Sequence, residues 1–131
     1  MSHFTRVRTQ IREREGLVRA LTDLHYRYRV GENLPVRGFL GAGERAEVVV
    51  DTGTEYDIGF VREREAYEAV ADWDWGIARK TSIRHSTFVE QLNRQYAYNL
   101  VMDQAREDCL IVEEEETLDN GDVVIVLAER E

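Results

Sequence analysis

The segment AEVVVDTGTEYDIGFV, residues 46–61, combines two strand-forming runs with a polar turn. Residues 46–50 and 56–61 are rich in Val, Ile, Phe and Tyr, which are typical of β-strands. Between them, residues 51–55 contain the Asp, Thr and Gly residues that are typical of turns. This pattern predicts a β-hairpin, and we therefore expect an antiparallel sheet in the protein.

The residues on the N-terminal side of this hairpin predict further strands and one helix. Residues 4–11 alternate between two faces, which is the period of a strand with one buried face. Residues 13–25 place apolar side chains at helical spacing, with acidic residues near the N-terminal end. Residues 26–30 return to the strand period, and we expect a turn at residues 31–33 before a strand at residues 36–40.

The residues on the C-terminal side predict a long helix and a second hairpin. Ser86-Thr87 resembles the start of a capping box, and apolar residues at helical spacing indicate a helix over residues 88–107. Residues 110–112 and 123–127 are strand-like and flank Asn120-Gly121. Because Asn-Gly favours a two-residue type I′ turn, we expect the chain to end in a tight hairpin.

Together these elements predict an α+β fold in a single domain, residues 1–131. The order of elements favours a mainly antiparallel sheet with two helices packed on one face. A chain of 131 residues is long enough for one core and too short for two full domains. Residues 66–85 combine helical spacing with aromatic strand formers, so the sequence allows either a helix or a strand there.

The composition predicts a cytoplasmic protein without a membrane-spanning segment. No stretch approaches the roughly 20 apolar residues that cross a bilayer. The first residues also lack the apolar run of a secretory signal. Cys109 is the only cysteine, which excludes an intrachain disulfide and suits a reducing compartment.

The net charge of −9 is distributed unevenly, with +4 over residues 1–30 and −9 over residues 101–131. An acidic protein repels phosphate backbones, so nucleic acid is not an expected partner. Residues 37–39 match the start of an RNA-recognition strand, but Leu40 and Gly41 break that pattern. We interpret the two charged ends as solvated or as paired with each other. The sequence is also compatible with a homo-oligomer.

Several short segments, taken in order, point to a family. They are Ser2-His3-Phe4, Val36-Arg37-Gly38-Phe39, Tyr56-Asp57-Ile58-Gly59-Phe60, Ala66-Tyr67-Glu68, Val70-Ala71-Asp72-Trp73, Trp75-Gly76, Gln95-Tyr96-Ala97-Tyr98 and Glu113-Glu114-Glu115. In this order the chain resembles, nearly from end to end, the hypothetical chloroplast open reading frame thirty-five family of plastids and cyanobacteria, domain of unknown function 1257. The resemblance gives no catalytic residues to carry over to this chain. It implies a small companion protein, and some relatives resemble products of gene neighbourhoods that contain an ATPase of the AAA+ class and a ferredoxin, which suggests a multi-protein assembly.

The residue types that carry metal, nucleophilic and phosphate chemistry lack the necessary spacing. His3, His25, His85 and Cys109 do not form a metal-ligand pattern, so we expect no metal site and no cofactor. Cys109 follows a helix end and two acidic residues, which disfavour a thiolate nucleophile. The glycine-rich residues 38–43 precede a strand rather than a helix, so a phosphate-binding loop is not predicted.

Three aromatic residues are the best candidates for binding a protein partner: Tyr67, Trp73 and Trp75. Trp and Tyr dominate the energetics of protein interfaces, and two tryptophans one residue apart share a face if their segment is a strand. Core packing explains the same residues equally well. Our first hypothesis is nevertheless a non-enzymatic accessory subunit that docks through this segment.

The rival hypothesis is a small enzyme or ligand-sensing domain with carboxylates in a pocket near these rings. The candidate residues are Asp57, Asp72 and Asp74. Desolvation beside an indole raises the pKa of a carboxyl group, as general acid catalysis requires. The alternative is that these acids face water or bond to backbone amides while the rings fill the core. A concave pocket with a buried carboxylate would favour the rival, and an exposed apolar patch would favour docking.

Overall fold

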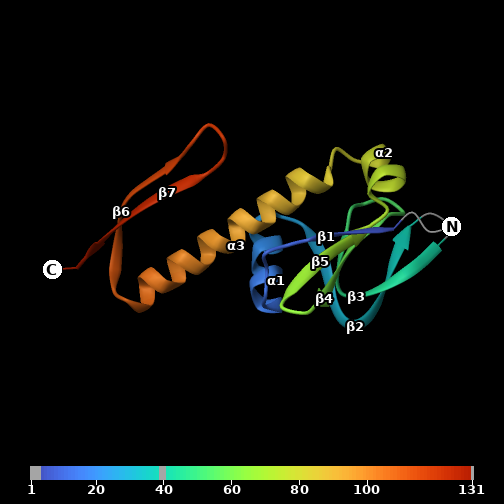
Figure 1. Cartoon of the computed structure of the whole chain (residues 1–131), viewed down its shortest axis with the longest axis horizontal. Helices are drawn as coiled ribbons and strands as arrows, with labels where there is room; N and C mark the ends of the chain where they lie inside the picture. The colour runs from blue at the N-terminus through green and yellow to red at the C-terminus, as the bar shows by residue number, and fades with distance from the viewer. Residues whose placement is uncertain (1–3, 39–40, 131) are drawn as a thin grey trace.

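The computed structural model describes residues 4–38 and 41–130, which form two antiparallel sheets and three helices (Figure 1). The elements are β1 (Thr5–Arg8), α1 (Arg14–Asp23), β2 (Arg27–Gly38), β3 (Gly41–Asp51), β4 (Asp57–Glu63), β5 (Ala66–Ala71), a π-helical turn η1 (Trp73–Ile77), α2 (Ala78–Lys80), α3 (His85–Glu107), β6 (Leu110–Thr117) and β7 (Val123–Glu129). This composition confirms the predicted α+β class. None of the helices in these two ranges is long and apolar enough to cross a membrane.

The larger sheet has the strand order β1-β5-β4-β3-β2, with every neighbouring pair antiparallel. The predicted hairpin is its centre: β3 and β4 pair with Val50 opposite Ile58 and Val48 opposite Phe60. The first strand is shorter than predicted. Its pairing with β5 nevertheless continues, because Thr9 N–H donates to the Tyr67 carbonyl at 2.9 Å.

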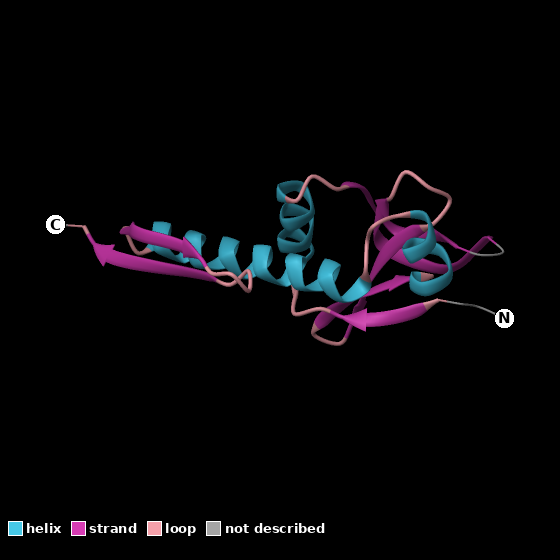
Figure 2. Cartoon of the chain, turned by 90° about the horizontal axis from the view of Figure 1, so that it is seen from above, coloured by secondary structure: helices cyan, strands magenta, loops and turns pink. Residues whose placement is uncertain are grey.

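Helices α1 and α3 cover one face of this sheet, as the sequence predicts (Figure 2). Leu17 and Leu21 of α1 and Phe88 and Leu92 of α3 are buried in one cluster with Phe60 of β4. The leucine spacing in α1 therefore gives the helix one apolar face, and burying that face stabilises the fold by about 2 kcal/mol per large side chain.

The opposite face of the sheet carries a smaller apolar cluster, which exists because the long strands β2 and β3 bend. Val36, Ala46, Val49 and Val70 are buried there. Gly59 lies beneath Val36, and a side chain at position 59 would overlap it. The absence of a side chain at this one position lets β2 approach β4 closely.

Two local predictions are wrong. Residues 31–33 do not form a turn between two strands, because a register shift between Val30 and Leu34 lets a single strand β2 bend without ending. The capping box at Ser86-Thr87 is also not formed. Arg84 has extended backbone angles and is the N-cap, so α3 begins one residue before Ser86.

The second half of α3 extends beyond the five-stranded sheet and carries the hairpin β6-β7 beside it (Figures 1 and 2). The hairpin is confirmed, but its turn is not type I′. Leu118 N–H donates to the Asp122 carbonyl at 2.7 Å, and Gly121 N–H donates to the Leu118 carbonyl at 2.9 Å, so the loop has three residues. Gly121 has a φ of +92°, whereas Asn120 is outside the positive-φ region. One left-handed glycine in a three-residue loop is the expected alternative to a type I′ turn.

Candidate functional site

Trp73 and Trp75 form an aromatic segment that follows directly after β5. The stretch for which the sequence allowed either helix or strand contains both a strand and a helical turn. Residues 66–71 form the strand β5, and Trp73–Ile77 forms the π-helical turn. The Asp72 carbonyl accepts hydrogen bonds from Gly76 N–H at 3.1 Å and Ile77 N–H at 2.8 Å. Because the two tryptophans lie in a turn and not in a strand, they do not share a face.

Trp73 is part of the core, with 3% of its surface exposed. Its indole Nε1 donates to the Thr5 carbonyl at 3.2 Å, which ties the π-helical turn to β1. The ring packs against the rings of His85 and Phe88 at the start of α3, with centroid distances of 6.0 Å to each. Trp73 therefore joins the sheet, the turn and α3.

Trp75 lies on the surface with 51% of its area exposed. The guanidinium carbon of Arg79 lies 4.2 Å from the centre of its ring, one helical turn further along the chain. Gly76 lies directly against the ring of Tyr56, where any side chain would overlap that ring. The backbone that carries Trp75 is thus held on both sides, by Trp73 in the core and by Tyr56 under Gly76.

Tyr67 is fully buried at the other end of β5. Its hydroxyl group donates to Glu47 Oε2 at 3.1 Å and accepts from Arg62 Nη2 at 3.3 Å. Burial, together with the hydrogen bond to Glu47, raises the pKa of Tyr67 above the ordinary value of 10.0. Tyr67 and Trp75 consequently do not lie on one surface, and of the three aromatic candidates Trp75 is the exposed one.

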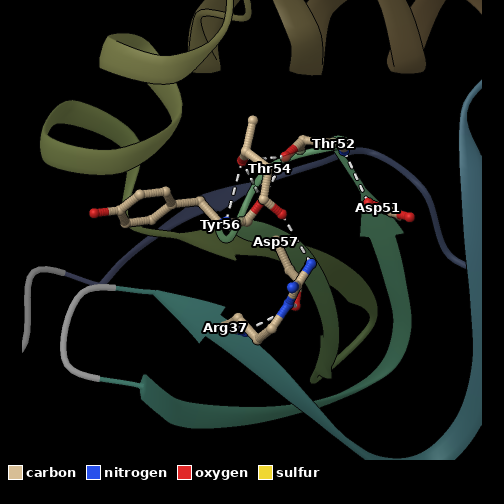
Figure 3. Close-up of polar contacts among 7 residues, drawn as sticks. Arg37, Asp51, Thr52, Thr54, Tyr56 and Asp57 are labelled. Atoms are coloured by element: carbon tan, nitrogen blue, oxygen red, sulfur yellow. Dashed lines mark hydrogen bonds and ion pairs between the residues drawn. The ribbon is translucent and has the colours of Figure 1, made fainter.

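Asp57 is the most completely bonded of the three candidate carboxylates, with 1% of its surface exposed (Figure 3). Arg37 Nε donates to Asp57 Oδ2 at 3.0 Å, and Arg37 Nη2 donates to Oδ1 at 2.8 Å. The backbone N–H of Arg37 also donates to Oδ2, at 2.9 Å. The hydrogen bond to Asp57 raises the pKa of Arg37 further above its ordinary value. The carboxylate is therefore held as an acceptor by three donors.

The loop between β3 and β4 positions Asp57 through its own hydrogen bonds (Figure 3). Gly53 N–H donates to Asp51 Oδ1 at 2.8 Å, and Thr52 Oγ1 donates to the Tyr56 carbonyl at 2.5 Å. Thr54 Oγ1 accepts from Tyr56 N–H at 3.1 Å. The Thr and Asp residues that predict a turn thus also fix where β4 begins.

The three carboxylates do not converge on one pocket. Asp72 is buried before the π-helical turn, and Asp74 is exposed beside Trp75. Asp57 lines an open cleft of about 420 Å³, which neither of the other two reaches. The residues that line this cleft are Arg27, Tyr28, Arg29, Pro35, Arg37, Asp51 and Asp57.

Three arginines in this cleft were not candidates from the sequence. Arg27 and Arg29 alternate with Tyr28 along β2, so their common face is readable from the strand period. Arg37 joins them only because β2 bends between Val30 and Leu34. Residues 31–33 mark the place of this bend, but their pattern predicted a turn between two separate strands, so it did not reveal the cluster.

The described residues contain no group of three or more His, Cys, Asp or Glu side chains placed to hold a metal ion. His3 and the residues Phe39 and Leu40 lie outside the described ranges. Cys109 is exposed after the end of α3, with a φ of +56°.

Comparison with known proteins agrees with the order of motifs. A family model described as a protein of unknown function, DUF1257, matches residues 20–126, which include the arginine cleft, the aromatic segment and most of the final hairpin. The chain belongs to this family. It is 30% identical over 127 residues to the uncharacterized protein ycf35 of Cyanophora paradoxa, covering 97% of this chain and 96% of that protein.

Two further relatives carry the same name. The uncharacterized protein ycf35 of Guillardia theta is 29% identical over 132 residues, covering 97% of this chain and 96% of its own length. That of Pyropia yezoensis is 28% identical over 115 residues, covering 81% and 80%. No solved structure matches the chain. The predicted family resemblance is confirmed.

Proposed function

We propose that this protein is a non-catalytic, cytosolic accessory subunit that docks on a protein partner, with Trp75 as the anchor residue. The observation that carries this proposal is the contrast between Trp73 and Trp75: one is 3% exposed and the other 51% exposed, two residues apart. A large aromatic ring on a backbone held by the core loses little conformational entropy on binding.

The chemistry around Trp75 suits a protein partner. Trp and Arg are the residues most enriched at the energetic centres of interfaces, and Arg79 stacks on the ring. A matching partner would offer an apolar pocket for the indole and an acidic group for the guanidinium. The finer form of the proposal is that this partner belongs to an AAA+ ATPase-linked complex, which is what the family resemblance suggests.

The bonding of Asp57 supports docking over catalysis. A general acid must keep its carboxyl group protonated and available to a substrate. Three donors from Arg37 instead occupy both carboxylate oxygens of Asp57, so the group is not available to a substrate. Asp72 and Asp74 lie outside the cleft that Asp57 lines, so the three candidate carboxylates do not form an acid–base pair with one another there.

The arginine cleft supports a second candidate function, the sensing of an anionic ligand. Arg27 and Arg29 line a cleft of about 420 Å³ in a protein whose net charge is −9, beside Asp51 and the ion pair of Arg37 with Asp57. Guanidinium groups bind phosphate and carboxylate oxygens in pairs. Titration with inorganic pyrophosphate should then raise the melting temperature of the wild type but not of Arg29→Gln, and an unchanged melting temperature of the wild type contradicts this function.

The docking proposal is tested by capture from the native host followed by mass spectrometry. Three tagged forms are compared: the wild type, Trp75→Ala, and Leu100→Ala as a matched control whose side chain is also half exposed but lies on α3. We expect Trp75→Ala to lose a partner that the other two retain, with a loss of about 2 kcal/mol or more in binding. Retention of every partner by Trp75→Ala contradicts the proposal.

A further inference from the structure

Strand β7 presents an unpaired apolar edge. Its first six residues, Val123-Val124-Ile125-Val126-Leu127-Ala128, carry no charge and no proline. Among the described residues β7 pairs with β6 alone. An isolated two-stranded hairpin is at best marginally stable, and a long apolar edge is a template for a further strand.

The other sheet edges are protected in ways that β7 is not. The edge strand β1 has only four residues, two of which are Arg6 and Arg8. The edge strand β2 contains Pro35 and several charged side chains. Short length, proline and charge are the usual devices that prevent edge-to-edge pairing. Because β7 lacks these devices, its edge is free to pair with a further strand.

Apolar side chains are exposed around the same edge. Val126 is 38% exposed on β7, and Val101 is exposed on the adjacent part of α3. An open groove of about 450 Å³ separates β7 from α3. Its apolar lining residues are Ala97, Val101, Leu118, Val123, Val124 and Ile125. A strand added to the edge of β7 would lie along this groove and bury these side chains.

The distribution of charge on the hairpin favours pairing between the β7 edges of two copies of this chain. Strand β6 carries Glu113-Glu114-Glu115-Glu116, so the β6 edges of two copies repel each other. Two β7 edges bring no charge together between residues 123 and 128. Joining the copies through β7 places both glutamate runs at the outer edges of a four-stranded sheet, as far apart as the sheet allows.

We infer that a second copy of this chain pairs its β7 antiparallel to β7, with the two-fold axis passing between the two Val126 residues. In this register Val124 lies opposite Ala128 of the second copy, so apolar side chains meet apolar side chains. Asp122 lies opposite Arg130 of the second copy, and the symmetry makes this opposite-charge pair twice. The edge is thus complementary to itself. This interface is separate from Trp75, so it is independent of the proposed docking function.

The first test is sedimentation of the full chain over a concentration series. We expect a dimer for the wild type and at least about a tenfold larger dissociation constant for Val126→Lys, because two lysines would face each other across the axis. In a single copy this lysine lies opposite Glu114 of β6, which is a favourable pair that keeps the hairpin folded. Val30→Lys is the matched control, an exposed valine on the edge strand β2, and it should leave the dimer intact.

The second test does not depend on the stability of the lysine variant. In a Cys109→Ser background, Val126→Cys should form an intermolecular disulfide under mild oxidation, because directly opposite residues of antiparallel strands have Cα atoms within disulfide range. Val30→Cys in the same background should stay uncrosslinked. A monomeric wild type at about 100 µM, a dimer that survives Val126→Lys, or equal crosslinking at both positions would overturn the inference.

Discussion

Arg37 and Asp57 form a two-pronged ion pair although they lie on β2 and β4, which are separated in the sheet by β3. The pair is possible because β2 bends over the face of the sheet that carries Val36 and Val49. Asp57 is buried, whereas the side chain of Arg37 is half exposed. The ion pair therefore holds the bend from the solvent side, while the valines hold it from within.

Removing the arginine side chain should destabilise the protein. We expect Arg37→Met to lower the free energy of unfolding by about 2 to 3 kcal/mol, because the buried carboxylate of Asp57 loses its charged partner. Arg37→Met with Asp57→Leu should cost less than Arg37→Met alone, since no unpaired charge remains. Urea unfolding measures both. Arg45→Met, at an exposed position of β3, is the control and should change stability little.

Two glycines with positive φ should respond differently to alanine. Gly53, with a φ of +80°, has open space where a Cβ would lie, so Gly53→Ala should cost about 1 kcal/mol through backbone strain alone. At Gly121 a Cβ would also overlap the Arg94 guanidinium group. That group donates to the Asn120 carbonyl at 2.9 Å and holds the hairpin tip on α3.

The two alanine variants are distinguished by amide hydrogen exchange. Gly121→Ala should speed exchange in β6 and β7, because the tip loses its contact with α3. Gly53→Ala should leave exchange in the hairpin unchanged and lower the global stability instead. Slow hairpin exchange in Gly121→Ala would show that Arg94 does not anchor the tip.

The buried Tyr67 and the partly buried Tyr26 predict a loss of stability at alkaline pH. Burial raises the pKa of Tyr67 and of Tyr26 above the ordinary value of 10.0. Above pH 10.0 the unfolded chain loses these protons before the folded chain does, so the free energy of unfolding falls as pH rises. The limiting slope is about 1.4 kcal/mol per pH unit for each such tyrosine. Urea unfolding between pH 9 and 11 measures the slope, and Tyr67→Phe should make it shallower.

Local patterns in the sequence were sufficient for helices α1 and α3 and for the two hairpins, but not for the single strand β2 or for residues 66–85. The hairpin of β3 and β4 follows from strand formers on either side of Asp, Thr and Gly residues. Helix α3 follows from the spacing of Phe88, Leu92 and Tyr96, all of which are buried. In each case the residues that indicate the element belong to the element itself.

The candidate site depended on contacts that such patterns do not contain. The meeting of Arg37 with Asp57 requires a bent strand, whereas the sequence predicted a turn between two strands at the place of the bend. The separation of Trp73 from Trp75 follows from a π-helical turn, which is rare and, over five residues, too short to show a period in the sequence. Gly76 is the one local sign of this turn, since only glycine fits against the ring of Tyr56.

The two tryptophans give the sharpest prediction, because Trp73 packs in the core and Trp75, two residues later, is the proposed anchor for a partner. Trp73→Ala should lower the free energy of unfolding by about 3 to 5 kcal/mol, since the indole packs on Phe88 and bonds to the Thr5 carbonyl. Trp75→Ala should cost less than about 1 kcal/mol, because its ring is half exposed and its stacking on Arg79 is at the surface. Urea unfolding of the two variants, made separately, gives the comparison. Should Trp75→Ala unfold as easily as Trp73→Ala, the exposed ring would be structural, and the loss of a partner by that variant would no longer identify a docking site.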